Sequence, residues 1–234
     1  MEFGRAFSYT QQDPEWLKKV GIAGLLMFIP IIGWLAVLGW GLEITRRVIN
    51  NDPGALPDWS NFTDHLVRGL KGFVVSFVFS LPGALVNGSQ GAVNALVANP
   101  NLLRNMDANT VQMLTTGVGI LAFCCGCLGF ILSLGSTFIL PAAFGNMMAK
   151  NGDLGAAFRF GEVFGLIRSA IGPYLMTLLG TIIVGIIVPF GLIACIIGVF
   201  FTAAWGTTVV SHLYGQAYNA AKAAQAAAPV VSAI

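Results

Sequence analysis

Charged side chains are scarce in this sequence, and their scarcity argues against a water-soluble fold. Only 9% of the 234 residues are Asp, Glu, Lys or Arg, against about 25% in a typical soluble domain. The charges leave four long gaps, which cover residues 20–42, 72–103, 108–149 and 169–221. A soluble chain of this length would lack the polar residues needed to cover its surface.

The four uncharged gaps are rich in Leu, Ile, Val, Phe, Ala and Gly, and the whole chain has a mean hydropathy of +0.79. An apolar run of 18 or more residues is long enough to cross a bilayer core. Helices satisfy their own backbone hydrogen bonds in lipid. We therefore predict an all-α, polytopic transmembrane bundle, with one integral membrane domain over residues 1–218 and an Ala-rich tail over residues 219–234.

Motifs that mark catalysis are also missing. The sequence has no HExxH motif, phosphate loop, nucleotide-binding fingerprint or Ser/His/Asp set. Ionisable groups inside the apolar runs, which usually mark ion or proton paths, are almost absent. We expect no enzyme activity, no catalytic, cofactor-binding or metal site, and no cofactor. The net charge of +2 gives no indication of nucleic-acid binding.

The first apolar run, residues 20–42, has two interpretations. Residues 1–16 are polar and of mixed charge, unlike a cleavable signal peptide, so we expect this run to remain in the protein. Pro30 and Gly33 near its middle are expected to kink or end a helix. The run is either one kinked span, or Trp16–Phe28 and Ile31–Val48 are the two arms of a hairpin that enters the membrane and returns.

The positions of Lys and Arg favour the hairpin. Basic residues near span ends collect on the cytoplasmic side. With a hairpin, all of them except Arg104 lie on one side of the membrane. We predict a Pro-broken hairpin plus four spans in the inner membrane of a prokaryotic cell, with both termini in the cytoplasm; the alternative is five spans.

Two amphipathic segments are predicted to lie at the cytoplasmic membrane surface. Residues 59–73 form the first segment and run into a span over 70–97 that is interrupted by Pro82. Residues 150–168 form the second, with Asp153 as its cap. A long apolar stretch over 111–148 lies between them. The block 171–218 is long enough for two spans with a turn at residues 189–191.

Aromatic and basic residues at the span ends are expected to anchor the protein at the interface. The predicted anchors are Trp16, Lys18, Lys19, Trp59, Tyr214 and Tyr218. We also expect His212, near the end of the last span, to be interfacial.

Uncharged polar residues and cysteines are the remaining candidates for chemistry. Asn87, Gln90 and Asn94 are candidates for a polar path through the membrane. The cluster Cys124, Cys125 and Cys127 has two interpretations: a soft-metal or redox site, or small residues in a helix interface. The flanking Gly and apolar residues favour the interface, and the role of the three thiols stays open.

Seven segments together resemble a known family. They are Asp13–Lys19 (DPEWLKK), Ile29–Gly33 (IPIIG), Arg46–Val48 (RRV), Leu56–Trp59 (LPDW), Leu140–Ala143 (LPAA), Ala156–Val163 (AAFRFGEV) and His212–Tyr218 (HLYGQAY). The sequence resembles the prokaryotic multi-pass membrane family named domain of unknown function 4013 over about residues 3–218. The resemblance implies a prokaryotic membrane protein and supplies no catalytic residue.

Two functions from different classes fit these features. The first is a non-enzymatic structural or accessory subunit, or a self-assembling scaffold, whose partners are membrane lipids and other subunits or further copies. The Gly-rich spans favour it, because small residues let helices pack closely in lipid. The alternative is a small channel or transporter for a neutral or lipid-like solute. A cleft joining Asp64, His65 and Glu162 would favour an enzyme instead.

Overall fold

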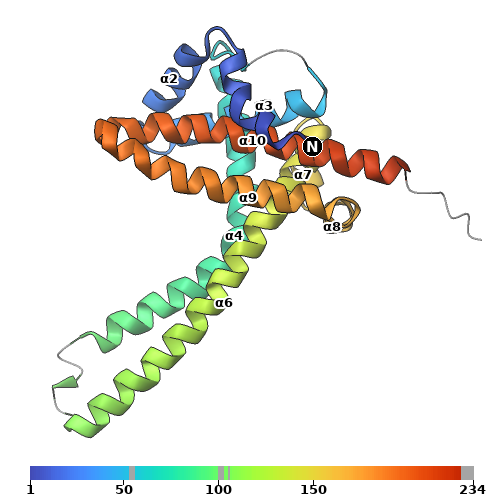
Figure 1. Cartoon of the computed structure of the whole chain (residues 1–234). Helices are drawn as coiled ribbons and strands as arrows, with labels where there is room; N and C mark the ends of the chain where they lie inside the picture. Colours follow the sequence, from blue (N-terminus) through green and yellow to red (C-terminus); the bar gives the residue numbers. More distant parts are fainter. Residues whose placement is uncertain (53–55, 100–102, 105, 228–234) are drawn as a thin grey trace, which may run out of the picture. The chain divides into compact units, whose positions relative to one another are not determined.

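The computed structural model describes residues 1–52, 56–99, 103–104 and 106–227, and within them the chain is helical without a strand (Figure 1). The elements are, in chain order, α1 (Phe3–Ser8), η1 (Tyr9–Gln12), α2 (Trp16–Leu26), α3 (Ile32–Ile49), α4 (Phe62–Val97), α6 (Ala108–Ala149), α7 (Leu154–Ala157), α8 (Phe160–Ser169), α9 (Ile171–Ile187), η2 (Val188–Ala194) and α10 (Cys195–Ala227).

Three helical segments are long and apolar enough to cross a membrane, as expected for a membrane protein. They are Phe62–Ala95, Ala108–Ala149 and Ile171–Ile193. The most apolar 18-residue window of the second has only 6% of its residues buried inside the protein, against 22% for each of the other two. The protein by itself therefore leaves this window of α6 largely uncovered, whereas residues 141–148 at the end of α6 are buried.

The chain divides into two compact units. The first contains residues 1–76 and 138–234, and the second contains residues 77–137. Helices α4 and α6 each contribute one part to each unit.

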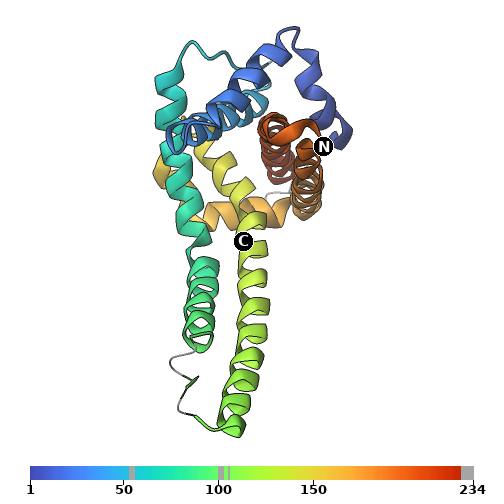
Figure 2. The same ribbon diagram turned by 90° about the vertical axis from the view of Figure 1, so that its left-hand side faces the viewer.

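Helix α10 is the centre of the first unit. It packs against α2, α3 and α9, and α9 and α10 lie side by side in both ribbon views (Figures 1 and 2). Trp40 and Ile44 of α3 are fully buried and belong to one apolar cluster with Val20 of α2 and Ala204 of α10. Burying a large apolar side chain of this kind contributes about 1.5–3 kcal/mol. This cluster holds α2 and α3 against α10.

The helix break predicted at Pro30 is confirmed. Helix α2 ends at Leu26 and α3 begins at Ile32, and between them Ile31 has a φ of 66°. Only glycine fits at position 33 in this turn, because a Cβ atom there would lie 1.7 Å from the carbonyl oxygen of Leu26. The structure therefore has two separate helices here, as the hairpin interpretation requires.

The two long helices are not interrupted by their prolines. Pro82 lies inside α4 and Pro141 inside α6, whereas the sequence predicted an interruption at Pro82. Proline removes only one backbone donor, and helices that cross membranes tolerate this loss where neighbouring groups compensate. Residues 62–73, the core of the first predicted surface segment, are continuous with the span that follows.

The segment predicted over residues 150–168 contains two short helices. Asp153 caps α7 as predicted, and its carboxylate accepts a hydrogen bond of 3.0 Å from the backbone nitrogen of Gly155. The helix then breaks at Phe158 and Arg159 before α8 begins. In α8 the buried side chains include Val163 and Leu166.

The predicted turn at residues 189–191 is confirmed, because the short 3₁₀ segment η2 connects α9 to α10 there. Helix α10 then continues as far as Ala227, beyond residue 218. In this last part Asn219 donates a 2.9 Å hydrogen bond to the carbonyl oxygen of Val48, and Ala221 is fully buried. The rest of the predicted tail, residues 228–234, lies outside the described residues.

Candidate functional site

The three residues predicted to line a polar path lie on the α4 part of the second unit. Gln90 donates a 2.7 Å hydrogen bond to the carbonyl oxygen of Ala122 in α6. The side chain of Asn87 lies against Gly129, where a Cβ atom would approach the amide oxygen to 2.2 Å. Asn94 and Gln90 line a small hollow of about 130 Å³. Two of these side chains therefore pack in the seam between α4 and α6.

The cysteine cluster lies on α6. Cys124 and Cys127 are exposed, whereas Cys125 is partly buried. Within the residues that the structure describes, no group of three or more His, Cys, Asp and Glu side chains is arranged to hold a metal ion. The side chain of the fourth cysteine, Cys195, lies outside the description.

Four of the predicted anchors lie on or near α2, and three of them have contacts inside the protein. Trp16 is partly buried and packs against the apolar cluster around Trp40. The ammonium group of Lys19 lies 2.8 Å from the buried carboxylate of Asp13 and 3.1 Å from that of Asp58. Trp59 donates a 3.0 Å hydrogen bond to the carbonyl oxygen of Lys19 and stacks on Trp40. Lys18 is exposed and forms an ion pair with Glu15.

Hydrogen bonds to Asp13 determine how its carboxylate titrates. Burial alone would raise the pKa of Asp13. The Lys19 ammonium and the backbone nitrogens of Glu15 and Leu56 stabilise the charged form and hold the pKa below its usual value. Asp13 thus connects the chain before α2 to the loop that follows α3.

A buried acidic residue, Glu43, holds three arginines at the end of α3. Its side chain is 7% exposed and contacts Arg46 at 2.6 Å, Arg68 at 3.0 Å and Arg47 at 3.5 Å. Arg68 belongs to α4, so the cluster ties α3 to α4. The cluster lines a cavity of about 170 Å³, and His65 lines this cavity as well.

Glu162 does not line the cavity that contains the other two residues of the predicted enzyme cleft. Asp64 and His65 line the cavity beside Glu43. Glu162 instead pairs with Lys150 and accepts a 2.9 Å hydrogen bond from Asn146. These two contacts, the first being the stronger, lower the pKa of Glu162 to about 2.

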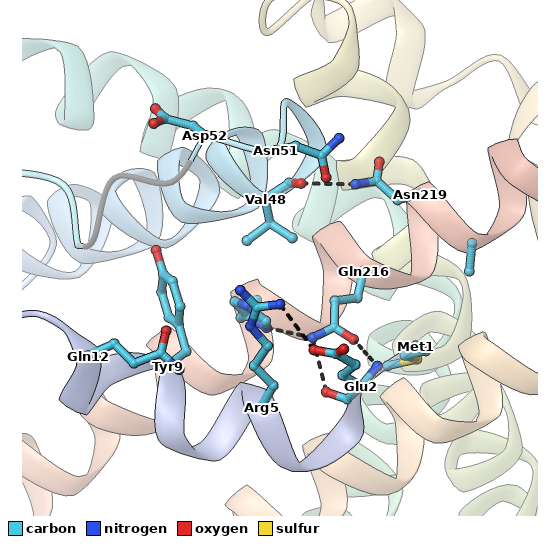
Figure 3. Close-up of a pocket in the computed structure, with 12 residues that line it drawn as sticks. Met1, Glu2, Arg5, Tyr9, Gln12, Val48, Asn51, Asp52, Gln216 and Asn219 are labelled. Atoms are coloured by element: carbon cyan, nitrogen blue, oxygen red, sulfur yellow. Dashed lines mark hydrogen bonds and ion pairs between the residues drawn. The ribbon is translucent and has the colours of Figure 1, made fainter.

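A pocket with many polar lining residues lies in the first unit, between the N-terminal segment, the end of α3 and α10 (Figure 3). Its volume is about 650 Å³. In Figure 3, Arg5 and Tyr9 form one wall, and Val48 and Asn51 lie across from them. The full lining is Met1, Glu2, Arg5, Tyr9, Gln12, Val48, Asn51, Asp52, His212, Gln216, Asn219 and Ala220.

Gln216 fixes the N-terminal segment to α10. Its amide oxygen accepts a 2.7 Å hydrogen bond from the backbone nitrogen of Glu2, and its amide nitrogen donates to the carbonyl oxygen of Glu2 at 3.1 Å. Arg5 completes this wall with a 3.1 Å ion pair to Glu2. Thr10 further along forms a hydrogen bond with Thr208 in a buried site.

His212 is buried here, with only 5% of its surface exposed, and is not at an exposed interface. Its ring lies 4.4 Å from that of Tyr9, measured between centroids. Its Nδ1 atom lies 3.0 Å from the amide nitrogen of Gln216, which donates to it. The sequence analysis missed this pocket because it assigned no structure to residues 1–12. The pairing of His212 with Gln216, four residues later on one helix face, was the available signal.

The other two predicted anchors, Tyr214 and Tyr218, also lie on α10. Tyr214 stacks on Phe144 of α6, and Tyr218 is 8% exposed. Both rings therefore pack inside the first unit.

Comparison with known proteins gives one match. A family model described as "Protein of unknown function (DUF4013)" matches residues 22–197. No curated protein and no solved structure matches the chain. The match covers α3 to η2, together with the last five residues of α2, and it leaves out most of α10 and the N-terminal segment that lines the pocket.

Proposed function

We propose that this chain, which belongs to the DUF4013 family, is a non-enzymatic subunit or self-assembling scaffold of a membrane complex in a prokaryotic cell membrane. The exposure of α6 carries the proposal. Its most apolar window is only 6% buried within the protein, so lipid or another polypeptide must cover it.

One face of α6 has the features of a helix-packing surface. Gly117, Cys124 and Ile131 are spaced by seven residues, so they lie near one another around the helix, and all three are exposed. The face opposite them, which includes Ala122 and Gly129, contacts α4. Helices associate in lipid through close van der Waals packing, which small residues permit. A second helix, from another subunit or another copy, is the occupant that we propose for this face.

Cysteine cross-linking tests contact between copies. In one variant Cys124 is the only cysteine, and in a matched control Cys125, which is partly buried on the α4 side, is the only one. For a scaffold we expect oxidation in native membranes to link Cys124 chains into dimers and to leave Cys125 chains monomeric. Equal cross-linking of both variants would indicate random collision.

Native mass spectrometry of the gently extracted protein tests for partners of any kind. We expect a mass that includes at least one further polypeptide, either a second copy or another membrane protein. A monomer that carries only lipid, together with the absence of Cys124 cross-links, would contradict the proposal.

The proposed topology is an N-terminal hairpin plus four spans, with the fourth in the first part of α10. The two amphipathic segments lie on the cytoplasmic side, and lipids contact the spans. The break between α2 and α3 supports this arrangement, since it gives the hairpin its two arms. The asymmetry of Lys and Arg supports placing both termini in the cytoplasm.

Cysteine labelling in intact cells tests this topology. In a chain without its native cysteines, Asp107→Cys is expected to react with a membrane-impermeant maleimide from outside. Asp153→Cys is expected to react only after the cells are permeabilised. The reverse pattern would invert the proposed orientation, and labelling of both sites from outside would exclude it.

The second candidate function is a channel or transporter for a neutral or lipid-like solute. The hollow beside Gln90 and Asn94 favours it, although a volume of about 130 Å³ is below the roughly 300–1,000 Å³ of ordinary small-molecule sites. The effect of substituting Gln90 is expected to differ between the channel and the scaffold.

A further inference from the structure

The charged side chains in the wall of the N-terminal pocket already have interactions within the protein. Arg5 pairs with Glu2 at 3.1 Å. Asp52 has interactions of its own and is attracted electrostatically to Arg46. A ligand with a net charge would meet side chains of both signs in this wall, and bringing such a ligand out of water is costly. The pocket therefore favours an uncharged ligand.

The remaining polar lining consists mainly of amides. Gln12, Asn51 and Asn219 come from three different elements and meet around the same space. Each amide offers a carbonyl acceptor and an NH₂ donor, and a hydroxyl group both donates and accepts. In Asn219 the amide nitrogen already donates to Val48, so its carbonyl oxygen is the atom suited to a ligand hydroxyl. Amides on three sides thus suit a ligand that carries several hydroxyl groups.

The walls are built before a ligand arrives. Gln216 holds Glu2 through two hydrogen bonds, and Tyr9 is fixed against His212. A site that needs little reorganisation loses less free energy on binding. Its volume of about 650 Å³ lies within the roughly 300–1,000 Å³ of small-molecule pockets.

From these three features we propose that the N-terminal pocket binds an uncharged polyhydroxy compound. Sugars, cyclitols and the sugar headgroup of a glycolipid share this chemistry. The site belongs to one chain and does not depend on the subunit or scaffold role, so a failure of either proposal leaves the other standing.

Binding is tested on the full chain in nanodiscs of phosphatidylethanolamine and phosphatidylglycerol, in which no sugar-headed detergent competes. The soluble probes are maltose and myo-inositol, titrated by calorimetry. The lipid probe is monogalactosyl diacylglycerol added to the nanodisc, with thermal stabilisation as the readout. We expect saturable binding of at least one probe. Binding of a soluble probe identifies a free sugar as the ligand class, and stabilisation by the galactolipid alone identifies a headgroup.

Two substitutions remove wall amides without removing contacts that hold the pocket together. They are Gln12→Ala and Asn51→Gly, the latter because Asn51 has a φ of 51°, which glycine adopts without strain. Each is expected to weaken binding about three- to tenfold, the effect of losing a single hydrogen bond. The matched control is Gln112→Ala, an exposed amide in the second unit, which is expected to bind like the parent chain.

Three outcomes would overturn the proposal. The first is the absence of saturable binding of all three probes. The second is equal binding by the parent chain and by both wall variants, with melting temperatures confirming that the variants are folded. The third is tighter binding of a charged probe, either inorganic phosphate or glycine betaine, than of maltose and myo-inositol.

Discussion

Gly39 of α3 and Gly69 of α4 lie against each other's helix backbone. A Cβ atom on Gly39 would lie 1.7 Å from the carbonyl oxygen of His65, and one on Gly69 would lie 1.7 Å from that of Leu35. Neither obstacle is a side chain that can rotate away. The two helices therefore cross at a distance that only glycine permits.

Substitution at this crossing tests the close approach. We expect Gly39→Ala and Gly69→Ala each to destabilise the protein by about 3 kcal/mol or more, the upper end for overpacking, since the helices have to move apart. Gly161→Ala is the matched control, because nothing lies within 4 Å of the added methyl group. It is expected to be neutral or to stabilise by up to about 1 kcal/mol. Thermal unfolding in detergent checks all three, and an unchanged melting temperature for both Gly39→Ala and Gly69→Ala would exclude this packing.

The crossing illustrates how much of the fold could be predicted from the sequence. The lengths of the apolar runs predicted the long helices. Pro30 and residues 189–191 predicted the positions of two helix breaks. Helical periodicity did not identify which face of α4 packs inside the first unit. The spacing of the residues predicts an apolar face made of Phe62, Leu66, Gly69, Leu70 and Phe73. Of these only Gly69 is buried, and the buried line runs through His65, Gly69 and Gly72. Close packing in a membrane protein selects small residues, so the most hydrophobic face need not be the buried one.

The pair formed by Asp13 and Lys19 is expected to be a major stabilising contact. The side chains are 3% and 13% exposed, and removing one partner leaves the other charge buried. Because Asp58 still pairs with Lys19, we expect Asp13→Asn to destabilise the protein by less than about 3–5 kcal/mol, the cost of leaving a buried charge unpaired. Lys19→Met is expected to cost a similar amount, and the double variant to cost less than the sum of both. Additive losses in this cycle, measured by unfolding, would show that the pair is not coupled.

The same pair predicts a dependence of stability on pH. The lowered pKa of Asp13 means that its contribution is complete above the unfolded value of about 3.9 and is lost as the pH falls through the folded value. Burial alone would lower the pKa of Lys19, but its contacts with Asp13 and Asp58 together raise the pKa above its usual value. Its contribution is complete below the unfolded value of about 10.4 and is lost as the pH rises through the folded value.

Melting temperatures measured across acidic pH check the first of these effects. Between pH 7 and about pH 4 the parent chain and Asp13→Asn are expected to differ by a constant amount. Below that range the difference is expected to shrink, because Asp13 becomes protonated in the parent chain. A difference that stays constant down to about pH 2 would contradict the assignment.

Glu43 provides a comparison between a buried and an exposed ion pair. Glu43→Gln leaves Arg46, Arg47 and Arg68 facing one another without their shared carboxylate. The expected loss is about 3–5 kcal/mol. In the matched control, Glu15→Gln breaks an exposed pair with Lys18 and is expected to cost less than about 1 kcal/mol. Similar losses for the two variants, measured by unfolding in detergent, would contradict the assigned burial.

The N-terminal pocket could not be predicted from the sequence. Its walls come from residues near both ends of the chain, such as Arg5 and Gln216, and from Asn51 in between. Spacing along the sequence carries no information on such contacts, because they depend on how α10 packs against α3. Asn and Gln side chains are also common on protein surfaces, so their presence in the sequence does not by itself indicate a binding site.

Gln90 separates the scaffold from the channel. Its amide donates a 2.7 Å hydrogen bond to Ala122 across the seam of the second unit, and such bonds contribute about 0.6–2 kcal/mol in a bilayer. If the amide serves packing, Gln90→Leu is expected to lower stability by that amount. The permeability of reconstituted vesicles to neutral solutes such as glycerol is then expected to stay at the level of empty vesicles.

Asn94→Leu is the matched control, because Asn94 is exposed beside the same hollow, and it should leave stability unchanged. Glycerol uptake that is faster with the parent protein than in empty vesicles, and that either substitution abolishes, would instead favour the channel, since a polar path requires these amides whatever their contribution to packing.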